Sequence, residues 1–251
     1  WPGIAAWTER ACWRAASMVL PVTGALAEYV RRVGVPAERI AITPNGVDAE
    51  RFRPRNASTA RERLNFGQSL VLGFIGHVRE WHGLDLVVDM LTRPLLADAH
   101  LLIVGDGPAR PLLEERVRQL HLVQRVHFTG TMPRDSLPEL TSCIDIALQP
   151  KVTLYASPLK LFEYMAAARA IVAPATFNIC EILEDGADGL LFEPDSTESM
   201  AIAIEKLAGD AALRDKLGRA AARKIASQNL TWRGNAERAV SLMRKLKVPV
   251  D

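Results

Sequence analysis

The sequence predicts an α/β protein with a doubly wound parallel sheet of the Rossmann-like kind. From Leu70 onward, short apolar runs alternate regularly with longer amphipathic segments. The apolar runs are nearly continuous, as expected for parallel strands that helices cover on both faces. Hydrophobic residues make up 49% of the chain, which is enough for a substantial core. In a sheet of this kind, ligands bind at the carboxyl ends of the strands.

The first part of the chain shows the same alternation but is too short for a complete sheet. A polar stretch, 53–61, follows it and is the expected main boundary. The elements expected before this boundary are a helix over Thr8–Ala16 capped by Thr8, a strand over 17–23, a helix over 25–34 that ends at Gly34, and a strand over 39–44.

The second part predicts six strands separated by helices. The expected strands cover 70–76, 100–107, 125–130, 144–150, 170–174 and 189–194. The expected helices cover 84–96, 109–122, 137–143, a segment from Pro158, 179–185 and 198–209, followed by two closing helices over 210–227 and 230–247, the last capped by Thr231.

Composition excludes several classes of function. The 31 basic and 29 acidic residues are spread through the chain and give a formal charge of +2, which argues against nucleic acid as the main partner. The three cysteines are widely separated, so neither a disulfide framework nor a zinc site is indicated, and a reducing cytoplasm is expected. The uncharged run 15–27 is too short to span a bilayer.

The segment 155–174 is built to hold an anion. Ser157 can cap a helix, Pro158 suits the first helical position, and good helix formers follow from Leu159. Free backbone N–H groups at the helix start, with Lys160 beside them, would bind phosphate. Glu163, one turn further on, suits the two hydroxyls of a ribose, because a carboxylate accepts two hydrogen bonds at once. A solvent-facing capped helix is the alternative.

This segment resembles the signature of the retaining glycosyltransferases of family 4, the glycosyl transferases group 1, which have the GT-B fold. In that family the helix start binds the diphosphate of a sugar nucleotide and a glutamate binds its ribose. The usual signature has two glutamates separated by seven residues. Glu163 matches the second, whereas Tyr155 stands in place of the first. The segments 44–48 (PNGVD) and 105–108 (GDGP) also resemble the family.

The loop after the first strand of the second part, 76–85, is expected to face the phosphates. Gly76 would let the backbone approach the ligand, and Arg79 offers a planar fork for an anion. In the family pattern two cations occupy the positions of His77 and His82. We therefore assign the catalytic charge to Arg79 and Lys160. His77 and His82 are expected to serve the donor as hydrogen-bonding residues of this loop, and a metal site at the two histidines is the alternative.

Three further loops complete the expected donor site, with one alternative each. Gly105 follows a strand in a turn that resembles the start of a dinucleotide fingerprint and also has a structural role. Thr131 and Met132 stand where the family contacts the nucleobase, or in an ordinary loop. Asn178 and Glu181 stand where the family faces the donor sugar, or are a helix cap and a first-turn acid.

The resemblance implies three parts: residues 1–56 as the end of an acceptor-side domain with the linker, 57–228 as the nucleotide-sugar domain, and 229–251 as a crossover helix. It implies a metal-independent glycosyltransferase without a cofactor, using a UDP- or GDP-sugar. Because the chain begins with Trp1 and not Met, we expect a fragment that is inactive alone. The alternatives are a non-catalytic nucleotide-sugar module and another enzyme, such as an epimerase or a Rossmann oxidoreductase.

The expected partners are the nucleotide-sugar donor and a sugar or lipid-linked acceptor held by the missing N-terminal domain. The family suggests a role in polysaccharide biosynthesis. The expected location is the cytoplasm, with peripheral association at the inner face of the membrane as a further option. Trp1, Trp7 and Trp13 could form a membrane-facing surface, although burial against the missing domain fits their spacing better.

Overall fold

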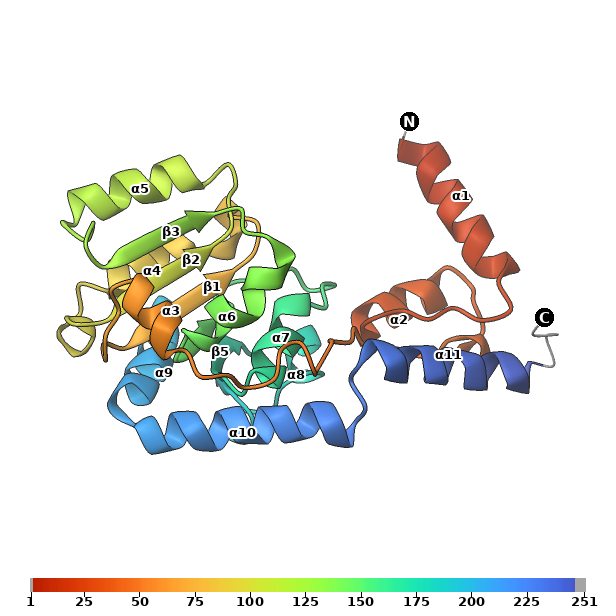
Figure 1. Ribbon diagram of the computed structural model, residues 1–251. Helices are drawn as coiled ribbons and strands as arrows, with labels where there is room; N and C mark the ends of the chain where they lie inside the picture. The colour runs from red at the N-terminus through yellow and green to blue at the C-terminus, as the bar shows by residue number, and fades with distance from the viewer. Residues whose placement is uncertain (1, 247–251) are drawn as a thin grey trace.

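The computed structural model describes residues 2–246 (Figure 1) and contains one parallel sheet of six strands in the order β3-β2-β1-β4-β5-β6. This confirms the predicted doubly wound fold class. The strands are β1 Val71–Ile75, β2 His100–Val104, β3 Val126–Gly130, β4 Ile146–Leu148, β5 Ala170–Pro174 and β6 Leu190–Phe192.

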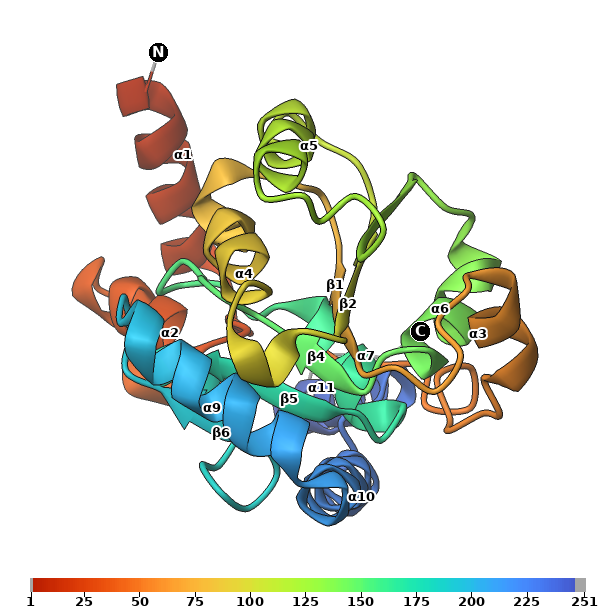
Figure 2. The same ribbon diagram turned by 90° about the vertical axis from the view of Figure 1, so that its left-hand side faces the viewer.

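Helices cover both faces of the sheet, which explains why the strands are apolar throughout. One face packs against α4 (Leu84–Met90), α5 (Arg110–Gln119) and α9 (Thr197–Gly209). The other face packs against α3 (Ser58–Arg63), α6 (Leu137–Ser142), α7 (Leu159–Ala166), α8 (Phe177–Cys180) and α10 (Ala211–Ser227). Figure 2 shows α4 and α9 on the same side of β4 and β5, with α10 on the opposite side.

The strand order reverses between β1 and β4. Strand β1 pairs with β2 on one side and with β4 on the other, and the crossovers run in opposite directions from this point. In sheets of this topology the loops after these two strands diverge, and the crevice that binds ligands is expected between them at the carboxyl ends of the strands. Both loops that sequence reasoning selected, 76–85 and the segment before Pro158, start at this crevice.

The N-terminal part lies to one side of the sheet and consists of α1 (Pro2–Ala15) and α2 (Gly24–Arg32) (Figure 1). The two strands expected here were wrong in extent. The segments form a single parallel bridge, Val19 with Ile40, because each has only the other as a partner. The expected cap Thr8 was also wrong. It lies inside α1, and its hydroxyl donates to the carbonyl oxygen of Ile4.

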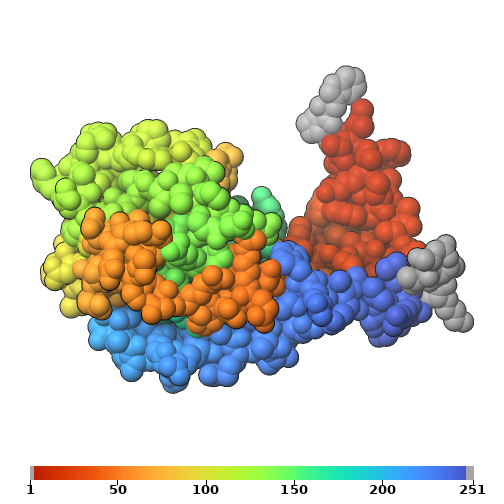
Figure 3. All heavy atoms as spheres, in the orientation of Figure 1, coloured from red at the N-terminus to blue at the C-terminus, as the bar shows by residue number. Residues whose placement is uncertain are grey.

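The last helix, α11 (Trp232–Lys245), lies beside the N-terminal part (Figures 1 and 3). Thr231 caps it as expected, accepting a hydrogen bond from the Gly234 backbone. The backbone N–H of Val47 donates to the carbonyl oxygen of Leu230 at 3.1 Å. The segment that leads from the N-terminal part to the sheet domain therefore lies beside the segment that leads back to α11. The part of the expected helix beyond residue 246 lies outside the described residues.

Other boundaries differ in detail. The polar stretch 53–61 contains the start of α3, and α5 covers Arg110–Gln119 where a helix over 109–122 was expected. The predicted three-part division of the chain stays a prediction. Trp7 is 71% exposed, whereas Trp13 contacts Tyr29 edge to face, and Trp1 lies outside the described residues. None of the helices in residues 2–246 has the length and apolarity required to cross a bilayer.

Candidate functional site

Helix α7 is fixed with its first turn at the crevice. The buried hydroxyl of Tyr164 accepts a 2.8 Å hydrogen bond from the backbone N–H of Ile75, the last residue of β1. Burial raises the pKa of the Tyr164 phenol far above its ordinary value, so the hydroxyl stays protonated. This contact ties the middle of α7 to the end of the strand at the switch point. Sequence reasoning missed Tyr164, because its partner lies 89 residues away.

The start of α7 presents free hydrogen-bond donors. The backbone N–H groups of Leu159 and Lys160 have no acceptor among residues 2–246. The structure places Pro158 at the N-cap with no side-chain capping bond. The expected cap Ser157 was therefore wrong. Its hydroxyl is buried without a partner, while its carbonyl oxygen accepts a 2.7 Å hydrogen bond from Asn45.

Lys160 lies at the centre of the site. Its ammonium nitrogen is 3.5 Å from the ring centroid of Phe74 and is partly buried. Burial lowers the pKa of Lys160 to about 7, although the nearby Glu163 carboxylate acts in the opposite direction. A Cβ atom added to Gly76 would lie 2.9 Å from this nitrogen. The glycine at the end of β1 therefore makes room for the lysine, which is a physical reason for a glycine at this position.

Glu163 is half-buried beside several cations. Burial raises the pKa of its carboxyl above the ordinary value, while Arg134, Lys160 and Arg51 act in the opposite direction. Three positive charges near the first two turns of α7 create a potential that favours an anionic ligand. Glu163 supplies hydrogen-bond acceptors next to this region, as a polyhydroxyl group beside a phosphate requires.

The loop after β1 places one histidine inside and one outside. His82 is packed between the rings of Phe74 and Trp81, and its Nδ1 accepts from the backbone N–H of Arg79. Burial, together with Lys160, His77 and Arg79, lowers the pKa of His82 to about 4, so the ring is neutral near pH 7. His77 is exposed.

The alternative of a metal site at the two histidines stays a hypothesis. Within residues 2–246, no three His, Cys, Asp or Glu side chains gather closely enough to hold a metal ion.

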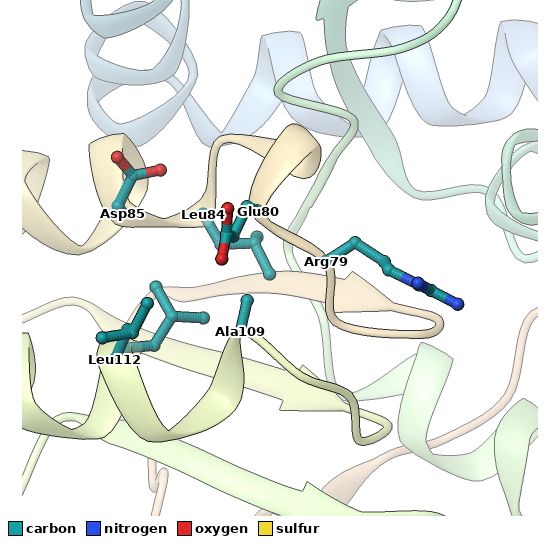
Figure 4. A pocket seen from close by; sticks show the side chains of 7 residues that line it. Arg79, Glu80, Leu84, Asp85, Ala109 and Leu112 are labelled. Atoms are coloured by element: carbon teal, nitrogen blue, oxygen red, sulfur yellow. The ribbon is translucent and has the colours of Figure 1, made fainter.

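Arg79 lies beside Trp81, with its guanidinium carbon 5.0 Å from the indole centroid. Its Nε is buried without a partner. A hollow of about 270 Å³ lies between α4 and α5 next to this arginine, but in Figure 4 the Arg79 side chain points away from the other residues around it. The guanidinium group of Arg79 therefore does not point into that hollow.

Gly105 holds two loops together. A Cβ atom there would collide with the carbonyl oxygen of Gly76, and its φ of 131° is one that side-chain-bearing residues rarely adopt. Its N–H donates to the carbonyl oxygen of Gly130. The structure thus gives Gly105 a packing role beneath the β1 loop.

The two residues expected at the nucleobase lie just after β3. Thr131 is exposed, whereas Met132 is half-buried and packs against the core on the α7 side of the sheet. Thr131 is accordingly free to meet a ligand.

Asn178 and Glu181 are both occupied by protein contacts. Asn178 is fully buried, and its side-chain nitrogen donates to the carbonyl oxygens of Thr153 and Ala156. Glu181 accepts from the backbone N–H of Gly24, at the start of α2. Asn178 thus shapes the loop before α7, and Glu181 joins α8 to α2. The alternative roles of a helix cap for Asn178 and a first-turn acid for Glu181 were wrong, because Asn178 lies inside α8 and Glu181 follows it, where it meets the start of α2 instead.

Comparisons with known proteins agree with this geometry. The pattern described as "Glycosyl transferases group 1" matches residues 69–210, which is more than half of the chain. The chain belongs to the glycosyl transferases group 1 family. A second pattern, described as "Glycosyltransferase Family 4", matches residues 1–51.

Curated relatives carry transferase names. Over 226 residues the chain is 29% identical to the alpha-D-kanosaminyltransferase of Streptomyces kanamyceticus, covering 87% of this chain and 58% of the relative. It is 28% identical to the D-inositol 3-phosphate glycosyltransferase of Nocardia farcinica, covering 84% of this chain and 48% of the relative. The chain thus spans about half the length of these relatives.

Solved structures of glycosyltransferases with the GT-B fold superpose well. HepE from Anabaena, crystallised with UDP, gives a TM-score of 0.81 at 23% identity, covering 91% of this chain and 64% of that one. The C-terminal domain of a group 1 glycosyl transferase from Francisella tularensis gives a TM-score of 0.65 at 22% identity, covering 73% of this chain and 98% of that one. At these identities, the likeness shows the fold.

Proposed function

We propose that this chain is the donor-binding part of a retaining, metal-independent glycosyltransferase that uses a UDP- or GDP-sugar. The observation that carries the proposal is the start of α7, where two unpaired backbone N–H groups and Lys160 meet beside Gly76. A helix start with a lysine beside it favours a diphosphate and needs no metal ion to do so. The UDP complex of HepE, a protein of the same fold, supports the choice of ligand class.

In the proposed reaction, the bond between the anomeric carbon of the donor sugar and the diphosphate oxygen breaks. The acceptor hydroxyl forms the new bond on the same face of the sugar and passes its proton to the departing diphosphate. Negative charge grows on the leaving diphosphate, where the N–H groups of α7 and the ammonium group of Lys160 stabilise it. Preorganised donors of this kind contribute about 3 to 4 kcal/mol each to transition-state stabilisation.

The remaining residues position the donor. Glu163 accepts from the ribose hydroxyls and fixes the nucleotide along α7. Arg79, whose Nε lacks a protein partner, completes the charge around the diphosphate. Thr131, exposed after β3, lies near the nucleobase. The acceptor is a sugar or a lipid-linked molecule bound by an acceptor-side domain, and the chain alone binds donor without transferring it.

A non-catalytic nucleotide-sugar module is the second candidate. The observation that favours it is Tyr155, which is 62% exposed and replaces a glutamate of the family signature. Measuring sugar transfer by the full-length protein, together with donor binding by this chain, separates the two candidates. Transfer identifies the enzyme, and binding without transfer identifies the module.

Calorimetric titration of the chain with UDP, GDP and NAD tests the donor site directly. We expect one nucleoside diphosphate to bind and NAD not to bind. Glu163→Gln should weaken that binding by about 1.5 to 3 kcal/mol, because a charge-assisted contact to the ribose is lost. Glu62→Gln, an exposed carboxylate on α3, is the matched control and should leave affinity unchanged. Equal losses in the two variants would contradict the assignment of Glu163.

A further inference from the structure

A second charged hollow lies at the opposite end of the sheet. Leu70, Asp145 and Arg169 directly precede β1, β4 and β5, so they mark the amino ends of the strands, whereas Lys160 and Gly76 are at the carboxyl ends. Figure 1 shows the turn between α9 and α10 at this same end, away from α1 and α2. The hollow has a volume of about 430 Å³, and its walls are formed by Arg55, Ala57, Arg61, Gln68, Leu70, Ser142, Asp145, Arg169, Ala208 and Arg214.

The charges around this hollow do not balance. Four guanidinium groups face one carboxylate, Asp145, and this carboxylate is already engaged by Arg61 at 3.2 Å and by the backbone N–H of Val71 at 2.8 Å. No carboxylate within residues 2–246 lies within 4.0 Å of the guanidinium groups of Arg55, Arg169 or Arg214. Three positive charges around one hollow are thus left without an acidic partner.

Two of these guanidinium groups are held in place by their inner edges. Arg169 donates through Nε and Nη1 to the carbonyl oxygens of Ala167, Ser142 and Ile144. Arg214 donates through Nη1 to the carbonyl oxygens of Leu207 and Ala208. The Nη2 groups of both residues have no acceptor in the described part of the chain. A guanidinium group that is already held in place, with its Nη2 free to donate, loses little side-chain entropy when it binds an oxyanion.

We propose that this hollow binds the phosphate group of a small phosphorylated molecule. Arginine forks match the oxygens of phosphate, and a volume of about 430 Å³ falls in the range of small-molecule sites. Arg169 and Arg214 supply preorganised donors, and the exposed Arg55, whose Nη2 donates to the carbonyl oxygen of Arg51, adds a third positive charge to the wall of the hollow. The site is separate from the donor site, because the whole length of the strands lies between them.

The test is calorimetric titration with two probes, inorganic phosphate and glucose 6-phosphate, on the chain and on four variants. Lys160→Gln removes the cation of the donor site, and we expect binding at the hollow to survive it. Arg214→Gln and Arg55→Gln should each weaken the affinity about tenfold, as the loss of one charge-assisted contact implies. Arg55→Gln changes an exposed residue and leaves the fold intact.

Arg219→Gln is the matched control. Arg219 lies on α10 like Arg214, and its guanidinium group contacts Asp215 outside the hollow. The substitution therefore removes the same charge without changing the hollow. We expect its affinity to stay within about twofold of the parent chain, since a distant exposed charge is screened. Tighter binding of glucose 6-phosphate than of phosphate identifies a phosphate ester as ligand, and equal binding identifies phosphate itself. Absence of binding in the Lys160→Gln variant, or an equal loss in Arg219→Gln, overturns the proposal.

Discussion

The backbone nitrogen of Gly24 lies 2.9 Å from each carboxylate oxygen of Glu181, across 157 residues of sequence. Gly24 is the first residue of α2, so the carboxylate meets the positive end of that helix dipole. A Cβ atom at Gly24 would collide with the same carboxylate. This contact joins the N-terminal part of the chain to α8, at the carboxyl end of the sheet.

Removing this contact should loosen α2 from the sheet domain. We expect Glu181→Ala to lower the free energy of unfolding by about 0.3 to 1 kcal/mol, the range for an exposed charge at a helix start. Glu184→Ala, three residues further on, removes an exposed carboxylate that contacts no cation in the described residues and should have no effect. Urea denaturation of the two variants measures the difference. Equal stabilities would show that the contact contributes nothing.

Asn45 should support donor binding through the backbone before α7. Its side chain donates to the carbonyl oxygen of Ser157 at 2.7 Å, so it fixes the segment that leads into the phosphate-binding turn. We expect Asn45→Ala to weaken nucleoside diphosphate binding by about 0.5 to 1.5 kcal/mol, the net contribution of one hydrogen bond. Asn56→Ala is the control, because the side chain of this exposed residue bonds only to Ser58 among residues 2–246. An unchanged affinity in Asn45→Ala would remove this link.

Gly76→Ala should damage the site as well as the backbone. The new Cβ atom would lie 2.9 Å from the nitrogen of Lys160, and the φ of Gly76 is 146°. Gly67→Ala is a matched control, because its φ of 50° imposes backbone strain while nothing lies within 4 Å of the added atom. We expect both variants to lose about 1 kcal/mol of stability from strain. Only Gly76→Ala should also lose diphosphate affinity in calorimetry.

Lys160 should make diphosphate binding depend on pH. Its pKa is about 7 in the free protein, compared with 10.5 as the ordinary value, so the unfolded chain binds more protons between these two values. The free energy of unfolding of the free chain should therefore rise with pH across that window. Diphosphate affinity should fall as pH rises above about 7, because binding then requires uptake of a proton. Calorimetric titrations in buffers of different ionisation enthalpy measure the number of protons taken up on binding. Lys160→Arg, which stays charged, should bind without taking one up.

The stacked pair His100 and His127 should make the fold sensitive to acid. Their nitrogens Nδ1 and Nε2 are 2.8 Å apart, and burial lowers the pKa of both rings below the ordinary 6.5. Below pH 6.5 the two imidazoles are protonated in the unfolded chain but stay neutral in the folded chain. The free energy of unfolding therefore falls as the pH falls. We expect His127→Gln to reduce this dependence in thermal denaturation. His121→Asn, at an exposed turn, should keep it.

The sequence determined the fold class and the succession of strands and helices from Leu70 onward. Apolar runs covered on both faces and the amphipathic segments between them are local patterns, and each of the six strands of the sheet lies within its expected range. The helix at Pro158 and the glycine loop after β1 were found for the same reason, because neighbouring residues determine where a helix starts and where a turn forms. The likeness to glycosyltransferases came from the same short segments.

Only the tertiary structure decided which side chains meet. Tyr164 bonds to Ile75, Asn45 to Ser157 and Glu181 to Gly24, and each pair is more than 80 residues apart. The lowered pKa of Lys160 arises from burial at a crevice that exists only where β1 and β4 diverge. Expected caps such as Thr8 and Ser157 were wrong, because a polar side chain chooses among partners that only the folded chain supplies. Burial and long-range hydrogen bonding have no local signature, and they set the chemistry of this site.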